Sequence, residues 1–272
     1  MTFIDHAAAH GLRISRLISD GRWHRVPTDD KPRKRNGAYL WDGIRGVVRN
    51  WATMDTFAAW RDGSAAKVSA REWRAEQRAA QVTEARKHAQ AAKVASEMLS
   101  RSSYEAHPYL AAKGFPAEMG LVLDGELLIP MRDHRTNAVQ SLQRITADGA
   151  KKFLAGGKAR GAVFRLGPPR PREWWLCEGY ATGLSVLAAL RDLRRSASVV
   201  VCFSAENLRF VAGHIKGAAY VMADNDASGT GERCAAITGL PWVMPETVGT
   251  DANDLHQSNG LRAVVRLIQT EK

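Results

Sequence analysis

In the last hundred residues, the pattern of hydrophobic and polar positions is that of a fold in which strands and helices alternate along the chain. Short apolar runs rich in β-branched residues predict strands, and segments with apolar positions three to four residues apart predict helices. The predicted strands cover residues 174–177, 198–203, 218–223 and 241–244, and the predicted helices cover residues 182–193, 208–215, 231–238 and 261–269. This alternation indicates an α/β domain with a parallel sheet, whose ligand site lies at the carboxyl ends of the strands.

The pattern before this domain divides the chain into three further parts. Residues 1–62 contain short apolar runs broken by Gly and Pro, which predicts a small β-rich module. Residues 63–103 are rich in Ala, Glu, Gln, Arg and Lys and predict a long, solvated helical linker from about residue 64 to 102. Residues 104–172 predict a basic α+β subdomain, and residues 173–272 are the α/β domain. Further strands are predicted over residues 23–26, 38–41, 46–51, 127–131 and 139–145.

Composition excludes several classes of protein. The chain is 45% hydrophobic and 25% charged, which fits a folded protein and excludes wholesale disorder or a collagen-like repeat. No run approaches the ~20 apolar residues that span a bilayer, and the N-terminus is a poor signal peptide, so no membrane association is predicted. Cys177, Cys202 and Cys234 lie far apart without a CxxC motif, which predicts reduced thiols, a cytoplasmic location and no zinc ribbon.

The net charge of +11 is distributed unevenly. Residues 132–172 contain 10 Lys and Arg against 2 Asp and Glu, whereas residues 173–272 contain 9 against 11. A basic block followed by a slightly acidic domain suits a protein that binds phosphates on one surface and metal ions on another.

Acidic residues follow the predicted strands of the α/β domain. Glu178 follows the first strand, Asp224 and Asp226 follow the third, and Asp251 and Asp254 lie in the last loop. A parallel sheet brings such strand ends together, and clustered carboxylates cannot all ionise without cations. Oxygen ligands alone suit Mg²⁺ or Mn²⁺. Each of these acidic segments taken singly is typical of a turn or a helix cap, but the order and spacing of the segments favour a metal site.

The segment from about residue 174 to 255, with these acidic residues in this order, resembles a Toprim domain, the metal-binding α/β module shared by bacterial-type primases, topoisomerases and some nucleases. The short sequence segments CEGYATGLS, FSAENL and DANDL further resemble segments of the primases of phages, plasmids and other mobile elements. The resemblance implies that Glu178 acts as a general acid/base or metal ligand, and that Asp224 and Asp226 chelate Mg²⁺. Two positions depart from cellular primases: Thr182 stands where they commonly have an acid, and Asn253 where they tend to have Asp.

The basic block resembles the subdomain that precedes Toprim in primase catalytic cores, where Lys and Arg line a groove for template and incoming nucleotide. The resemblance implies such roles for Arg144, Lys151 and Lys152, with Gln143 and Lys158 as further candidates. Lys and Arg at these positions can neutralise phosphates, although an ordinary solvated basic face would have the same composition.

The N-terminal module interleaves aromatic and basic residues, a combination that sequence-tolerant single-strand binders use. The candidates for template contact are Trp23, Arg25, Arg33, Lys34 and Arg35. In a module this small a Trp is more often part of the core, and both alternatives stay open. Primases of this class usually carry a zinc ribbon at this end, but the required cysteines are lacking, so no zinc is expected.

These features predict a primase-like nucleotidyltransferase of a mobile element that uses Mg²⁺ or Mn²⁺, nucleoside triphosphates and a single-stranded DNA template. A 3′-hydroxyl would attack the α-phosphate of an incoming ribonucleotide. The sequence has no G-x-x-x-x-G-K-[ST] motif, so a replicative helicase is expected to act in trans. Two alternatives are a Toprim nuclease and a non-catalytic DNA-binding accessory or anti-defence protein, the latter favoured by Thr182 and Asn253.

Overall fold

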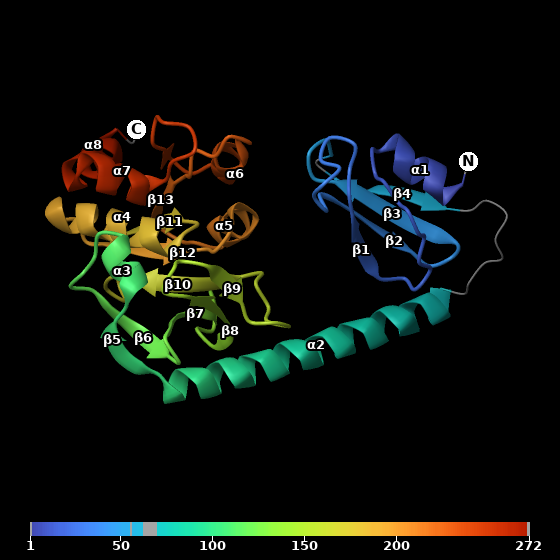
Figure 1. Ribbon diagram of the computed structural model, residues 1–272, viewed down its shortest axis with the longest axis horizontal. Coiled ribbons are helices and arrows are strands. Elements are labelled where there is room, and N and C mark those ends of the chain that lie inside the picture. Colours follow the sequence, from blue (N-terminus) through green and yellow to red (C-terminus); the bar gives the residue numbers. More distant parts are fainter. Residues whose placement is uncertain (1, 55, 62–69, 271–272) are drawn as a thin grey trace. The chain divides into compact units, whose positions relative to one another are not determined.

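The computed structural model describes residues 2–54, 56–61 and 70–270. The chain forms two compact units, Met1–Gln77 and Arg78–Lys272. Figure 1 shows the first unit in blue and the second in green to red.

The small unit is a four-stranded antiparallel sheet with one helix against it. The helix is α1 (Phe3–Ala9), and the strands lie in the order β1 (Trp23–Val26), β2 (Gly37–Trp41), β3 (Arg45–Asn50) and β4 (Ala58–Arg61). Phe3 of α1 is buried with Tyr39 and Val48 of the sheet, and its ring stacks on Trp41 with centroids 4.6 Å apart. This core accounts for the glycine at position 46, where a Cβ would overlap the Phe3 ring.

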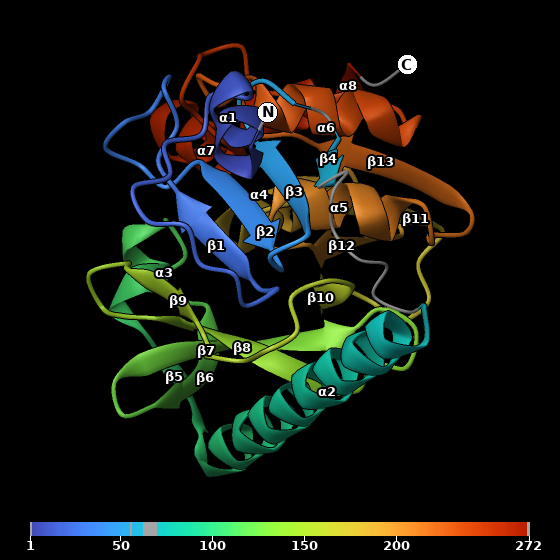
Figure 2. The same ribbon diagram turned by 90° about the vertical axis from the view of Figure 1, so that its right-hand side faces the viewer.

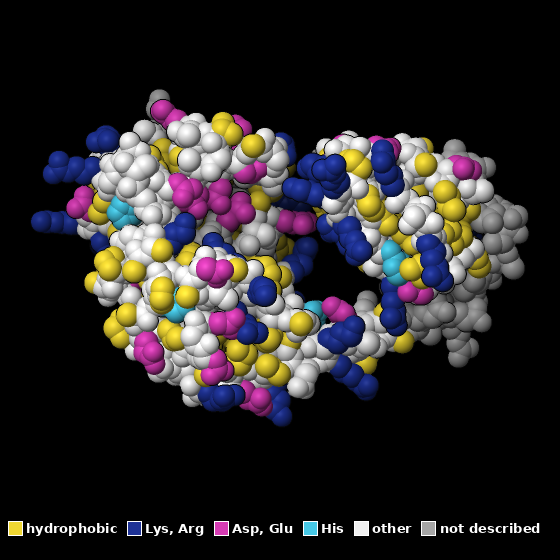
Figure 3. Space-filling view, viewed as in Figure 1, with side chains coloured by type: hydrophobic (Ala, Val, Ile, Leu, Met, Phe, Trp, Pro, Cys, Tyr) yellow, Lys and Arg dark blue, Asp and Glu magenta, His cyan; other side chains and the backbone are white. Residues whose placement is uncertain are grey.

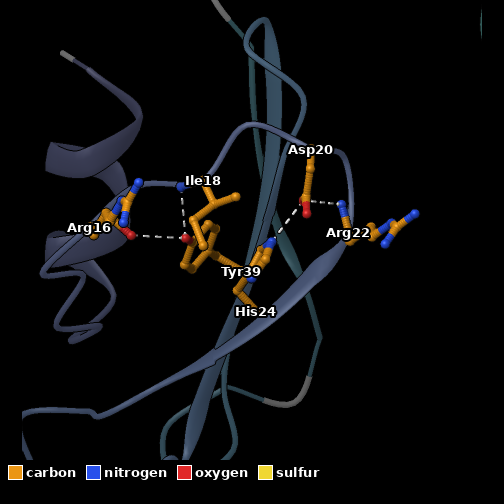
Figure 4. Close-up of polar contacts among 6 residues, drawn as sticks. All are labelled: Arg16, Ile18, Asp20, Arg22, His24 and Tyr39. Atoms are coloured by element: carbon orange, nitrogen blue, oxygen red, sulfur yellow. Dashed lines mark hydrogen bonds and ion pairs between the residues drawn. The ribbon is translucent and has the colours of Figure 1, made fainter.

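Hydrogen bonds to Tyr39, which is buried, and to Asp20 fix the segment that leads into β1 (Figure 4). The Tyr39 hydroxyl donates to the Arg16 carbonyl at 3.2 Å and accepts from the Ile18 N–H at 3.0 Å. Nearby, the Asp20 carboxylate lies 2.7 Å from Nε2 of His24, whose ring contacts that of Tyr39 at a centroid distance of 5.3 Å. The first residues of β1 are therefore held against the core of the small unit.

The large unit is built on one ten-stranded sheet. The strand order is β14-β13-β11-β12-β10-β7-β6-β5, and β8 pairs with β7 and β9. The four strands β14, β13, β11 and β12 are parallel, which confirms the predicted parallel sheet, and β10 joins them to the antiparallel part by pairing with both β12 and β7. The strands are β5 (Ser103–Ala106), β6 (Met119–Leu123), β7 (Glu126–Asp133), β8 (Val139–Ile145), β9 (Lys151–Phe153), β10 (Ala162–Leu166), β11 (Glu173–Cys177), β12 (Ala197–Val201), β13 (Ala218–Met222) and β14 (Trp242–Val243).

Helices cover both faces of the parallel strands (Figures 1 and 2). One face packs against α4 (Tyr180–Asp192), α7 (Ala252–Asn259) and α8 (Leu261–Gln269), and the other packs against α5 (Ala205–Ala212) and α6 (Thr230–Thr238). Neighbours on β11 show the alternation, because Trp175 belongs to the first core and Leu176 to the second. Strands buried on both faces explain the nearly unbroken apolar runs in the sequence.

The remaining helices, α2 (Ala70–Arg101) and α3 (Pro108–Ala112), flank the antiparallel strands. Near its end, α2 contributes Ala95 to a core with Leu128 and Leu142 of the sheet. The predicted long helix is confirmed over these residues, and its first part, before residue 70, lies outside the described residues. Among the described residues, no helix is both long and apolar enough to cross a bilayer.

One prediction about secondary structure was wrong. The expected last loop, with the sequence GTDAND, contains the first residues of helix α7. Asp251 is the N-cap and Asp254 is its partner in a capping box, so the two acidic residues begin a helix rather than a loop.

Candidate functional site

The strand ends of the parallel sheet gather the acidic residues as the sequence predicts. Glu178 directly follows β11, and Asp224 lies two residues beyond the adjacent parallel strand β13. The next residue, Asn225, donates its N–H to the Thr250 carbonyl at 3.0 Å, which ties the start of α7 to the same end of the sheet. Figure 3 shows Asp and Glu side chains gathered on this part of the large unit. We call Glu178, Asp224, Asp226, Asp251 and Asp254 the acidic rim.

Asp224 is the electrostatic centre of the acidic rim. Burial, together with the charges of Glu178 and Asp251, raises the pKa of its carboxyl from 3.8 to about 8, although the charge of Lys151 acts in the opposite direction. Its Oδ1 atom is buried and has no hydrogen-bond partner. A buried, unpartnered carboxylate oxygen is rare in folded proteins and is suited to receive a cation or a ligand's donor group.

Glu178, like Asp224, is a largely buried carboxyl group with a raised pKa. Burial raises the pKa of its carboxyl, and the charge of Asp226 adds to this effect. A hydrogen bond from the backbone N–H of Ala205, the first residue of α5, works in the opposite direction. The raised pKa brings Glu178 nearer to neutral pH, where a carboxyl group can both accept and return a proton.

Asp226 differs from Asp224 because its carboxylate is satisfied by the protein. Its oxygens accept the backbone N–H groups of Ser228 at 2.9 Å and Gly231 at 2.8 Å, together with the Ser228 hydroxyl. Burial acts to raise its pKa, but these hydrogen bonds together lower it to about 2. Asp226 is therefore a fixed negative charge that also organises the turn into α6.

Asp251 and Asp254 have structural partners as well. Asp251 accepts the backbone N–H groups of Asn253 at 2.7 Å and Asp254 at 2.9 Å, while Asp254 accepts the N–H of Asp251 at 3.1 Å. The other oxygen of Asp251 accepts a hydrogen bond from the Thr182 hydroxyl at 3.0 Å. Thr182, the first departure from the cellular pattern, thus supplies a neutral donor to the acidic rim.

The second departure, Asn253, points away from the acidic rim. It is fully buried, and its amide nitrogen donates to the Lys113 carbonyl at 2.9 Å and to the Ser185 hydroxyl at 3.1 Å. Its amide oxygen accepts from Gln257 at 2.8 Å. Asn253 therefore ties α7 to α4 and to the turn after α3.

The acidic rim suits a hard divalent cation that keeps part of its water shell. Among the residues that the structure describes, no three His, Cys, Asp or Glu side chains form a ready-made set of metal ligands. Mg²⁺ does not need one, because it is commonly held by one or two carboxylates with waters and substrate phosphates completing its shell. The unpartnered Oδ1 of Asp224, beside Glu178, fits this mode of binding.

One residue of the basic block faces the acidic rim. Ile145, which pairs with Lys151 across β8 and β9, is part of the core beneath the parallel strands, so Lys151 lies on that face of the sheet. Its ammonium lies 5.7 Å from the centre of the Tyr109 ring. Partial burial and the charge of Lys113 lower the pKa of Lys151, and three carboxyl groups of the acidic rim oppose this shift.

Of the other candidates from the basic block, Arg144 and Lys152 lie on the opposite face of the sheet from Lys151. Arg144 and Lys152 pair with each other on the opposite face of the sheet, the face that α2 covers, and Arg144 forms an ion pair with Glu126 at 2.5 Å. Gln143 is buried on the same face as Lys151, and Lys158 is exposed in the loop after β9. The groove implied by the resemblance would therefore draw on two faces of the sheet.

Two residues beside the acidic rim were missed from the sequence. The Tyr109 hydroxyl is buried without a hydrogen-bond partner, and burial together with the charge of Asp251 raises its pKa to about 12. Lys113 lies close enough to Lys151 for the two charges to interact. Both come from the region of α3, whose surroundings in the sequence are acidic, so charge patterning gave no signal for them.

In the small unit, the structure places every candidate for template contact at the surface. Trp23 and Arg25 lie on β1, and Arg33, Lys34 and Arg35 lie in the loop between β1 and β2.

Substitution of Gly231 by Ala is expected to displace the Asp224–Asp226 turn. A Cβ at this position would overlap the Asp224 carbonyl oxygen, and the Gly231 N–H is itself bonded to Asp226. We expect a loss of about 1–3 kcal/mol in the free energy of unfolding, measured with urea. Gly213→Ala is the control, because the nearest atom to its Cβ is 3.7 Å away. Equal stability of the two variants would contradict the close approach described here.

A comparison with protein families finds a match to the segment that contains the acidic rim. Residues 174–262 match the family described as Toprim domain, which covers β11 through the beginning of α8. Among solved structures, the primase fragment of the bacteriophage T7 primase-helicase protein is 18% identical, with a TM-score of 0.45 over 62% of this chain and 75% of that chain. The RNA polymerase domain of Mycobacterium tuberculosis primase DnaG is 15% identical, with a TM-score of 0.39 over 70% of this chain and 76% of that chain.

Proposed function

We propose that the chain is a DNA primase that synthesises short RNA primers on single-stranded DNA, a proposal that the match of residues 174–262 to the Toprim domain family supports. The observation that carries the proposal is the unpartnered Oδ1 of Asp224 beside Glu178, with Lys151 close enough to Asp224 for their charges to interact. This arrangement supports the proposal, because carboxylate oxygens that can bind a divalent cation lie near an ammonium group that can bind a triphosphate.

In the proposed reaction, a 3′-hydroxyl attacks the α-phosphate of an incoming nucleotide. The new bond joins the 3′-oxygen to phosphorus, and the bond to the leaving pyrophosphate breaks. A divalent cation held by Asp224 would supply positive charge at the reacting phosphate. Lys151 binds the triphosphate, because its ammonium faces the acidic rim. Glu178 takes the proton of the hydroxyl, a role that its raised pKa favours.

Asp226 and Asp251 orient the site rather than react. Asp226 holds the turn that presents Asp224, and Asp251 holds the start of α7 beside Thr182. Asp226, whose pKa is lowered, also keeps negative charge near the cation position. A replicative helicase acting in trans is part of this proposal, since the sequence contains no nucleotide-binding motor motif.

The test is synthesis on mixed-sequence single-stranded DNA with labelled ribonucleotides and Mg²⁺ or Mn²⁺. Wild type is compared with Asp224→Ala and with Asp192→Ala, a matched control at an exposed position at the end of α4. We expect short oligonucleotides on a denaturing gel from wild type and Asp192→Ala, and none from Asp224→Ala.

Two other results would contradict the proposal and identify a different function. Cleavage of the template without nucleotides, lost in Asp224→Ala, would identify a Toprim nuclease. DNA binding without synthesis or cleavage, insensitive to a chelator, would identify a non-catalytic DNA-binding accessory protein.

A further inference from the structure

The outward face of the small sheet exposes large aromatic side chains. Trp23 is 48% exposed, Phe57 51% and Trp51 36%. Side chains alternate across a strand, and in β1 His24 faces the Tyr39 ring in the core, so Trp23 and Arg25 point to the opposite face. The aromatic rings that stabilise this unit, such as Phe3 and Trp41, lie on the inner side, so the exposed rings are not needed for its core.

Arginine side chains lie among these exposed rings. The guanidinium carbon of Arg25 lies 4.1 Å from the centre of the Trp51 ring, and that of Arg49 lies 5.4 Å from Trp51 and 5.0 Å from Phe57. In the sheet register, Arg25 and Arg49 both pair with the small residue Ala38, so they form one row across the face. We call Trp23, Arg25, Arg49, Trp51 and Phe57 the outer aromatic face.

The geometry of the outer aromatic face is fixed by other contacts. Trp23 contacts Phe57 with ring centroids 5.3 Å apart. The Arg25 guanidinium donates to the Arg35 carbonyl at 2.8 and 3.1 Å, which holds it in place and ties the basic loop before β2 to the face. Side chains held in this way lose little conformational freedom when a ligand binds, which favours affinity.

The charge of the small unit identifies the class of ligand. Residues 1–61 contain eleven Lys and Arg against six Asp and Glu, and three of the basic residues are the exposed run Arg33, Lys34 and Arg35. Figure 3 shows Lys and Arg side chains beside hydrophobic ones on the visible surface of this unit. A polyanion with flat, accessible rings matches both properties. Single-stranded DNA has both, whereas the bases of a duplex are stacked inside it.

We propose that the outer aromatic face binds single-stranded DNA, with bases stacking on Trp23 and Phe57 and phosphates contacting Arg25 and Arg49. Such contacts tolerate any sequence, because every base has a face on which a ring can stack. The inference goes beyond primer synthesis at the acidic rim, because it assigns a second binding surface that requires neither metal nor nucleotide.

The first test uses the wild-type full chain and fluorescence anisotropy without divalent cations or nucleotides. A labelled 12-nucleotide strand of mixed sequence is compared with an abasic strand of equal length and charge, and with the corresponding duplex. Stacking predicts binding of the base-containing strand at least about tenfold tighter than the abasic strand. Equal affinity for the two strands, or tighter binding of the duplex, would overturn the proposal.

The second test uses the double variant Trp23→Ala/Phe57→Ala, with Ile4→Ala as control. Ile4 is 46% exposed and lies on α1, which packs on the other face of the sheet. We expect the double variant to bind the base-containing strand and the abasic strand with equal affinity. The control should keep the wild-type preference for the base-containing strand. A double variant that folds by circular dichroism and keeps the preference would contradict the assignment. Because the assay contains no nucleotides, its result is independent of primer synthesis.

Discussion

Replacing Asp224 with Asn is expected to abolish primer synthesis and, at the same time, to stabilise the folded protein at pH 8. The activity loss follows from the role proposed for Asp224 as a cation ligand, and we expect it to reach roughly a thousandfold or more. The gain in stability follows from the unpartnered, buried carboxyl group, which is unfavourable for folding when no cation is bound.

The pH dependence of this gain has a definite sign. The Asp224 pKa is raised from 3.8 to about 8, so the folded protein keeps a proton that the unfolded chain releases between these values. Stability therefore falls as the pH rises from about 4 to about 8, and the penalty is complete above pH 8. A shift of this size corresponds to a penalty on the order of 5 kcal/mol, which an amide does not incur.

Urea unfolding at pH 5 and pH 8 without divalent cations measures both parts of the effect. The free energy of unfolding of the Asp224→Asn variant should exceed that of the wild type by about 2–5 kcal/mol at pH 8 and by much less at pH 5. The control is Asp192→Asn, at the exposed end of α4. An Asp224→Asn protein that is less stable than wild type at pH 8, or one that still makes primers, would contradict the environment and the role assigned here.

Asn253→Asp is expected to lower the free energy of unfolding by about 3–5 kcal/mol, although it would restore the Asp-x-Asp of cellular primases. The substitution removes the donors to the Lys113 carbonyl and the Ser185 hydroxyl and puts a carboxyl group in a fully buried site. The loss should grow with pH as the unfolded chain ionises this group.

The control is the same substitution at Asn259, which is exposed at the end of the same helix. Thermal and urea unfolding of the two variants provide the measurement. A loss below about 1 kcal/mol for Asn253→Asp would show that this position does not need an amide.

The α/β domain was predictable because its signals are local. Strands that are buried on both faces appear as apolar runs, and the acidic residues that follow them, such as Glu178 and Asp224, come to one end of a parallel sheet by topology alone. The family resemblance, over about residues 174–255, and the match to the Toprim domain, over residues 174–262, cover nearly the same segment.

Other properties of the site depend on information that a linear pattern does not contain. Lys151 and Lys152 are neighbours in sequence, but the strand alternation sends only Lys151 toward the acidic rim. Deciding which of the two lysines faces the acidic rim requires the register of β8 and β9, because a shift by one residue would exchange the faces on which they lie. Asp251 was predicted to lie in a loop, because Asp is common both in turns and at helix N-caps.

The pairing of β10 with β12 has a consequence for how this chain can be divided. The predicted boundary at residue 172 falls between two segments that share a single hydrogen-bonded sheet. If residues 173–272 were produced alone, β12 would become an exposed edge strand with unpaired N–H and C=O groups, which promotes aggregation. The same property favours reassociation of the two segments when they are produced separately, because each carries the strand edge that the other pairs with.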